Sequence, residues 1–193
     1  MFTEDYLMRI INQAIAALMT AIGLRKAGKN SEALQAIQQA IEQLTTLPAY
    51  IVDQMDDGSI LSTLSVHGQL DVGRLVILAD LYQEQGEIFL GLDQPVQGSI
   101  AFARALRFIL EVVLPEDANL STENIGKVEA LVQRLNGHPL PVETQLALSD
   151  FYQRLLEKDD PSLATAGTSR KQVSQALVEL QAQLGTIQNT IGD

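Results

Sequence analysis

Apolar residues spaced three and four positions apart constrain the fold of this chain more than any other feature of its sequence. The first stripe lies within residues 3–27 and consists of Leu7, Ile11, Ala14, Leu18, Ala21 and Leu24. This spacing places side chains on one face of a helix, so it predicts an α-helix over about residues 3–27. After Gly28, a second stripe follows at Leu34, Ile37, Ile41 and Leu44. A connection of about three residues between two helices predicts an antiparallel hairpin.

The same spacing returns after a less regular segment. It predicts a short helical piece over 49–55, and then helices over about 71–92, 100–113, 122–135 and 141–155. The segment over 56–73 is the least regular part of the chain before the tail, because three glycines lie among dispersed polar residues. The expected N-caps are Thr3, Asn30 or Ser31, and Ser121 or Thr122. Aromatic residues make up only 5% of the chain and tryptophan is absent, so composition favours an all-α fold of about seven helices.

A segment of small and polar residues, KDDPSLATAGTS, precedes the last predicted helix. It predicts a helical domain over 1–157, a linker over 158–168 and a C-terminal helix over 169–193. That helix carries Val173, Leu177, Leu180, Leu184, Ile187 and Ile191 at spacings of 4, 3, 4, 3 and 4. Such a narrow heptad seam has two interpretations. The helix either folds back as a cap over the preceding domain or mediates self-association of two chains.

Residues 79–110 combine the hairpin pattern with particular residue types at fixed positions. Tyr82, Gly86 and Phe89 lie on the first helix of this hairpin, and Phe102 and Ala105 lie on the second. The arrangement resembles a tetratricopeptide (TPR) hairpin, in which small residues allow two helices to approach closely. The hairpin over 21–44 fits the same frame with Ala21, Leu24, Gly28, Ala33, Ile37 and Ala40.

The two frames lie 86 − 21 = 65 residues apart, which is not a multiple of the TPR period of about 34 residues. Gln85 and Leu110 also depart from the motif. The resemblance therefore implies an irregular TPR-like, right-handed array of antiparallel helical hairpins. The segments DYLMR, EALQAIQQAIEQL and LADLY are in addition similar to an uncharacterised bacterial family, which brings no assigned activity.

The TPR-like resemblance implies a non-catalytic protein–protein interaction module with a groove lined by the first helix of each hairpin. The candidate groove residues are Arg25, Lys26, Asp80, Gln83 and Glu87, with the apolar Ile15, Leu18, Ile22 and Leu90 beside them. The expected partner is an unidentified protein or peptide, or another copy of the chain bound through the C-terminal helix. The alternative is a small-molecule binder or enzyme in a helical-bundle core, with a polar cavity lined by Asp80, Glu87 or Arg104.

The charge of the chain argues against two classes of partner. Lys and Arg total 13 and Asp and Glu total 24, so the formal charge is 13 − 24 = −11. This acidity opposes binding to nucleic acid or to an anionic membrane. Glu4 and Asp5 precede the first apolar run, unlike a secretory signal. The uncharged run over 10–24 is expected to be too short and too polar to span a bilayer. A cytoplasmic protein is therefore expected.

Few residues carry the patterns of catalytic or metal chemistry. The chain has no cysteine, and His67 and His138 have no second metal-ligating residue at helical spacing. A calcium loop over Asp53, Asp56 and Asp57 fails because Met55 and Leu64 occupy positions that need oxygen ligands. Ser59, Ser62 and Ser65 lack a nucleophile-elbow context. No catalytic, cofactor-binding or metal site is expected, so the chain is not expected to be an enzyme.

Overall fold

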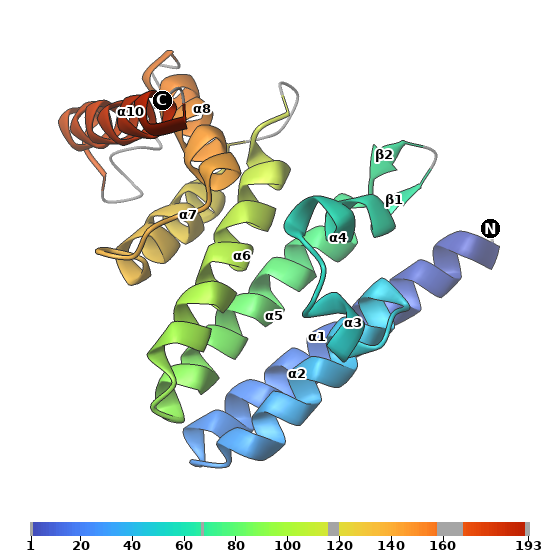
Figure 1. Cartoon of the computed structure of the whole chain (residues 1–193). Helices are drawn as coiled ribbons and strands as arrows, with labels where there is room; N and C mark the ends of the chain where they lie inside the picture. Colours follow the sequence, from blue (N-terminus) through green and yellow to red (C-terminus); the bar gives the residue numbers. More distant parts are fainter. Residues whose placement is uncertain (1, 67, 116–119, 158–167, 192–193) are drawn as a thin grey trace. The chain divides into compact units, whose positions relative to one another are not determined.

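The computed structural model describes residues 2–66, 68–115, 120–157 and 168–191, and its described part is all-α apart from one small hairpin (Figure 1). The helices are α1 (Phe2–Lys26), α2 (Asn30–Thr45), α3 (Ala49–Val52), α4 (Asp57–Thr63), α5 (Val72–Gly91), α6 (Pro95–Val113), α7 (Thr122–Arg134), α8 (Val142–Glu157) and α10 (Arg170–Ile191). The strands β1 (Ser65–Val66) and β2 (Gln69–Leu70) pair antiparallel, with Ser65 opposite Leu70. The all-α prediction is confirmed, and adjacent helices pack as antiparallel pairs.

The described residues contain nine helices, whereas the sequence predicts about seven. The difference lies in the segment between α2 and α5, where α3 and α4 are only 4 and 7 residues long. The chain forms two compact units, residues 1–108 and 109–193, and α6 contains the boundary between them. The linker predicted over 158–168 lies outside the described residues except for its last position.

The N-terminal unit is built around α5, which packs against both α1 and α2. Its buried residues include Leu75, Leu78, Leu81, Tyr82 and Ile88. At one end, the Asn30 side chain of α2 donates a 3.0 Å hydrogen bond to the Gly91 carbonyl. At the other end, the Arg74 guanidinium lies 3.3 Å from the Leu44 carbonyl. The start of α2 thus lies at the end of α5, and the end of α2 lies at the start of α5, so these two helices are antiparallel. Because α1 and α2 form an antiparallel hairpin, α1 runs parallel to α5.

The pair α5 and α6 packs closely at one glycine. A Cβ atom added at Gly86 would lie only 2.5 Å from Cε1 of Phe102, which is buried. One turn before Gly86, the rings of Tyr82 and Phe108 meet edge to face with their centroids 5.7 Å apart. The ring of Phe102 therefore occupies the space that any larger residue at position 86 would fill.

The expected N-caps have mixed outcomes. Ser121 caps α7, since its hydroxyl accepts a 3.2 Å hydrogen bond from the Asn124 amide. Neither Asn30 nor Ser31 caps α2: the N-cap position is Lys29, which makes no side-chain cap bond. The Asn30 side chain instead bonds across to α5. Thr3 is not an N-cap, because α1 already begins at Phe2.

Two arginines attach the segment between α2 and α5 to the helices around it. Arg104 of α6 lies within 2.5–3.4 Å of three backbone carbonyls, those of Val52, Asp53 and Met55, and pairs with Asp57 at 3.2 Å. Arg74 of α5 pairs with Asp71 at 2.8 Å and reaches the Leu44 and Leu64 carbonyls. These carbonyls lie in loops and at helix ends, where the hydrogen bonds of a continuous helix do not satisfy them, although those of Val52 and Leu64 also accept the amides of Met55 and Asp71.

The C-terminal unit has its core on α8, where Phe151, Tyr152 and Leu155 are buried. Helix α10 packs along α8, and two residues of its heptad seam, Val173 and Leu180, are buried. The seam residues Leu177 and Leu184 are half-buried, and the side chains of Ile187 and Ile191 lie outside the described part. A third arginine, Arg154 of α8, binds the Val113 and Pro115 carbonyls at 2.5 and 2.6 Å.

Candidate interaction surface

The last turn of α1 is joined to α5 by a bidentate ion pair. The Arg25 Nε atom lies 2.5 Å from Oε1 of Glu84, and its second nitrogen lies 3.2 Å from Oε2. The Glu84 side chain is only 8% exposed, so the pair fixes α1 against α5 in a partly desolvated setting. The hydrogen bond to Glu84 raises the pKa of Arg25, although desolvation opposes this, and the negative charges of Glu84 and Glu87 raise it further.

The predicted groove residues of α5 lie beside this ion pair. Asp80 and Glu87 are four residues before and three residues after Glu84, so the three carboxylates share one side of the helix. Asp80, Gln83 and Glu87 are half-buried, and both acids take part in polar or electrostatic interactions of their own. The structure thus brings Arg25 to the acidic side of α5, whereas Lys26 is exposed.

Glu84 lies next to the predicted groove residues of α5, but it was not identified from the sequence. It falls between the predicted positions Gln83 and Glu87, one place off the stripe that they form. One feature of the sequence could have pointed to Glu84: the basic residues at the end of α1 and the acidic residues of α5. A nearly buried acid needs a cation close by, and the end of α1 supplies one. The sequence shows that the two helices carry opposite charges, but it does not show which acid of α5 lies opposite Arg25.

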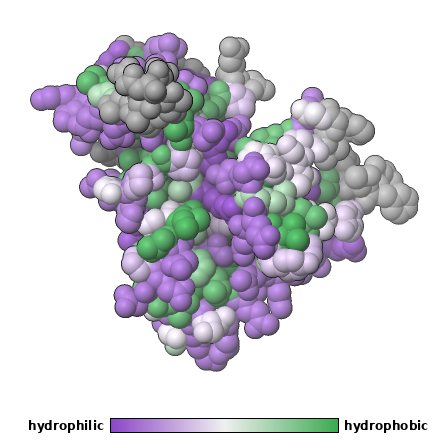
Figure 2. Space-filling model, in the orientation of Figure 1, coloured by the Kyte–Doolittle hydropathy of each residue, from purple (hydrophilic) through white to green (hydrophobic). Residues whose placement is uncertain are grey.

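Helix α1 carries apolar side chains into the solvent beside the stripe on α5. Met8, Ile15 and Met19 are 57%, 39% and 63% exposed, while Leu18 and Ile22 are half-buried. On the face in view, Figure 2 shows hydrophobic patches (green) among hydrophilic side chains (purple). We call the combination of Ile15, Met19, Ile22 and Lys26 with Asp80, Gln83, Glu87 and Leu90 the α1–α5 surface. It is apolar along α1 and acidic along α5.

The apolar character of α1 corrects one sequence expectation. Judged by length and composition alone, residues 5–26 are long enough and apolar enough to cross a membrane, and only 17% of the most apolar stretch of this helix is buried within the protein. The uncharged run was expected to be too short and too polar for this. The same measure is met by core helices of soluble proteins, so it carries no assignment by itself.

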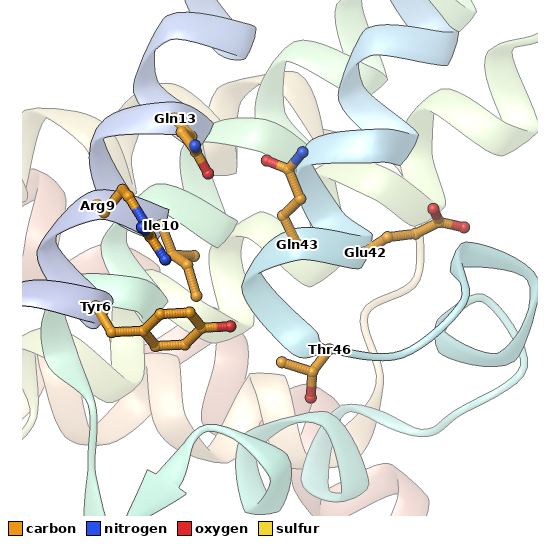
Figure 3. Close-up of a pocket in the computed structure, with 7 residues that line it drawn as sticks. All are labelled: Tyr6, Arg9, Ile10, Gln13, Glu42, Gln43 and Thr46. Carbon is orange, nitrogen blue, oxygen red and sulfur yellow. The ribbon is translucent and has the colours of Figure 1, made fainter. Parts of the chain in front are cut away.

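One open pocket of about 390 Å³ lies between the start of α1 and the end of α2 (Figure 3). Tyr6 and Arg9 stand on one side, and the Arg9 guanidinium carbon lies 5.3 Å from the centre of the Tyr6 ring. Across from them is Glu42, whose carboxylate already accepts a 2.8 Å hydrogen bond from the Ala49 amide. Arg9 and Glu42 thus already have partners within the protein. Among the described residues, none of the buried polar atoms without a hydrogen-bond partner lines this pocket.

A second open pocket, of about 320 Å³, lies in the C-terminal unit between the end of α7, α8 and α10. Tyr152 lines it and hydrogen-bonds to Glu129. Burial raises the pKa of Tyr152, and the charge of Glu129 and the bond to it raise it further. Burial also raises the pKa of Glu129, although the bond from Tyr152 opposes this. Neither pocket is lined by Asp80, Glu87 or Arg104, the residues named for the bundle-core alternative.

The remaining residues considered for chemistry have structural partners. Asp56 caps α4, with its side chain accepting a 2.8 Å hydrogen bond from the Ser59 amide, and the bonds from Ser59 lower its pKa. Burial raises the pKa of Asp57 although the Arg104 charge opposes this. His138 is exposed, and His67 lies outside the described residues. Across the part of the chain that the structure describes, no group of three or more His, Cys, Asp or Glu residues is arranged to hold a metal ion.

Comparison with known proteins gives one finding. No curated protein matches the chain, and no solved structure matches it. A family model described as "Family of unknown function (DUF6483)" matches residues 1–185, which is nearly the whole sequence. The chain therefore belongs to this family, DUF6483.

Proposed function

We propose that this chain is a non-catalytic protein–protein interaction module of irregular TPR-like type, in which the α1–α5 surface holds a segment of a partner protein. The proposal is supported first by helix order. In a right-handed TPR array the first helices of successive hairpins run parallel, and each second helix runs antiparallel to them. Here α1 runs parallel to α5, and α2 runs antiparallel to α5 and packs against it.

The second support is the contact at Gly86. A glycine that admits an aromatic ring from the second helix allows the close crossing on which stacked hairpins depend. Phe102 lies in that position, 2.5 Å from where a Cβ would be. The observation that carries the proposal is the surface itself, because exposed apolar residues at helical spacing beside an acidic stripe suit a helical or extended basic segment of a partner. A cytoplasmic location fits this function and is part of the proposal.

The test is partner capture by the purified full chain from a lysate of its source organism. Glu87→Lys and Asp80→Lys each reverse one charge of the α1–α5 surface, and Glu123→Lys is the matched control because Glu123 lies on α7 with its side chain 77% exposed. We expect the same partner to be captured by the wild type and by the control and lost with both surface variants. Circular dichroism checks that each variant is folded. Equal capture by all four proteins would contradict the proposal.

A further inference from the structure

Helix α1 carries a second regular pattern on its exposed side. Starting from Asp5, the residues Met8, Asn12, Ile15, Met19, Ile22 and Lys26 follow at spacings of 3, 4, 3, 4, 3 and 4, and we call these seven residues the α1 seam. All of them are exposed except Ile22, which is half-buried. The seam lies apart from the buried residues Ile10, Ala14 and Ala21, so the fold of the chain leaves it without a covering element among the described residues.

The spacing determines what kind of object fits the seam. Alternating steps of three and four place residues along a nearly straight line on a helix, which is the pattern that packs against another helix in a coiled coil. From Asp5 to Lys26 this line covers 22 residues, or about 33 Å at 1.5 Å per residue. A short loop of a partner would contact only part of such a line.

The charges at the two ends of the seam select the partner and its direction. The seam begins with an acid, Asp5, and ends with a base, Lys26, while its middle is apolar except for Asn12. If the same helix of a second chain lies antiparallel on it, each Asp5 comes near the Lys26 of the other chain. A parallel pair would place like charges side by side. The seam is therefore self-complementary about a two-fold axis, which is the requirement for an isologous dimer.

We propose that two copies of this chain associate through their α1 seams as an antiparallel pair. The C-terminal helix is a weaker candidate for self-association, because Val173 and Leu180 of its heptad seam are already buried within its own unit. The proposal does not rest on the proposed function, but Ile15, Met19, Ile22 and Lys26 belong to both surfaces, so the dimer and a bound partner segment compete for them. It is tested by the oligomeric state of the purified chain alone, whereas partner capture tests the α1–α5 surface, so failure of one is distinguishable from failure of the other.

The first experiment measures molar mass by light scattering during size-exclusion chromatography, over a range of loading concentrations of the full chain. We expect the wild type to pass from monomer to dimer as concentration rises. Met19→Glu, which places a charge at the centre of the seam, should remain monomeric at every concentration. Thr20→Glu is the control, because Thr20 is exposed on another side of the same helix, and it should dimerise like the wild type.

The second experiment tests direction by charge exchange. Asp5→Lys and Lys26→Asp each replace two attractive contacts of the dimer by two repulsive ones, and each should weaken dimerisation about tenfold. The double variant restores opposite charges and should recover the dimer. Recovery supports the antiparallel arrangement, and a double variant no better than the single variants would overturn it.

Three further outcomes would overturn the proposal as a whole. One is a wild-type chain that stays monomeric at all concentrations, and another is equal dimerisation of Met19→Glu and Thr20→Glu. The third is a membrane role for the seam: a monomeric wild type that binds phosphatidylcholine vesicles and loses that binding with Met19→Glu. Far-UV circular dichroism of every variant confirms that the helices are formed, since the substituted side chains are exposed.

Discussion

Two glycines in helices of the N-terminal unit have opposite surroundings. Gly86 of α5 faces the buried ring of Phe102, whereas a Cβ at Gly23 of α1 would meet no atom within 4 Å. Alanine at either position gains about 1 kcal/mol of helix propensity over glycine. At Gly86 that gain is outweighed, because a core that must accommodate an extra carbon typically loses about 1–3 kcal/mol.

We therefore expect Gly86→Ala to lower the free energy of unfolding by up to about 2 kcal/mol, and Gly23→Ala to leave it unchanged or raise it by up to about 1 kcal/mol. Urea unfolding followed by circular dichroism measures both. If the two variants had the same stability, the contact with Phe102 would not be the reason for glycine at position 86.

The pair of Glu129 and Tyr152 makes stability depend on pH. Burial raises the folded-state pKa of Glu129 above its ordinary value of 4.5, so the folded chain binds this proton more tightly than the unfolded chain. The contribution of Glu129 to stability is then greatest below that value and falls as pH rises through the folded-state pKa. One carboxylate oxygen of Glu129 is buried without a hydrogen-bond partner, which agrees with this direction.

Glu129→Gln removes the ionisation while its amide oxygen still accepts the bond from Tyr152. We expect this variant to be more stable than the wild type at pH 7, with the difference shrinking at pH 4. The control is Glu123→Gln on the same helix, where the exposed side chain pairs with Lys127 at 3.7 Å and the change should stay within about 0.5 kcal/mol. A gain for Glu129→Gln that is the same at both pH values would contradict the assignment.

Single residues were predictable where the physical reason is local. Ser121 as a cap follows from neighbouring residues in the sequence, whereas Gly86 as a point of close packing followed from the resemblance of residues 79–110 to a TPR hairpin. Asn30 was misassigned because its side chain bonds to Gly91, 61 residues away, instead of to its own helix. Glu84 was missed for the same reason, since its partner Arg25 lies 59 residues before it. Such choices depend on tertiary register, which spacing within one helix does not encode.

At the scale of elements, the long amphipathic helices were the predictable part. The helices over 72–91, 95–113, 122–134 and 142–157 match the predicted ranges to within a few residues, apart from the start of α6. The segment between α2 and α5 was not predictable in this way, because α4 and the β1–β2 hairpin are too short for periodicity to register. Their structure depends on contacts from outside the segment, above all those of Arg104 and Arg74.

The geometry of Arg104 leads to a prediction for this segment. Its guanidinium donates hydrogen bonds to the Val52, Asp53 and Met55 carbonyls and pairs with Asp57. Lysine has no planar group of several donors that could bind all of these acceptors together. We expect Arg104→Lys to lower the free energy of unfolding by about 1–3 kcal/mol and to speed amide hydrogen exchange in 52–57. Arg9→Lys, on an exposed guanidinium over Tyr6, should change stability by less than about 0.5 kcal/mol. Unchanged exchange over 52–57 would show that Arg104 does not hold the segment.

At the scale of the whole molecule, the chain divides into the units 1–108 and 109–193, each with its own buried residues. Composition and spacing were enough to predict the all-α class, because both are properties of the complete chain. The boundary within α6 was not predicted, since a continuous helix carries no glycine, proline or polar break at that point. The predicted α1–α5 surface followed from the resemblance of two hairpins and remains a proposal.

Because each unit has its own core, we expect a core substitution in one unit to destabilise mainly the helices of that unit. Leu180→Ala removes a buried side chain of α10 and should cost about 2 kcal/mol, with faster amide hydrogen exchange mainly in α8 and α10. Gly86→Ala should speed exchange mainly in α1, α2, α5 and the part of α6 up to residue 108. Val178→Ala is the control for the first, because Val178 is 65% exposed. Exchange that rises equally throughout the chain for both variants would show a single cooperative unit instead.

The arginines at positions 74, 104 and 154 all bind main-chain oxygens, and this affects which positions can vary among members of the family. Each bonds main-chain oxygens, and every residue type supplies the same main-chain oxygen. At Met55, for example, Arg104 bonds the main-chain carbonyl, and this acceptor stays in place when the side chain changes. Among relatives we expect the side chains of these loops to vary while the arginines stay the same, except at Asp57 and Asp71, whose carboxylates pair with Arg104 and Arg74. Conservation of an arginine in this family would then indicate a role in binding the main chain before it indicates a role in binding a ligand.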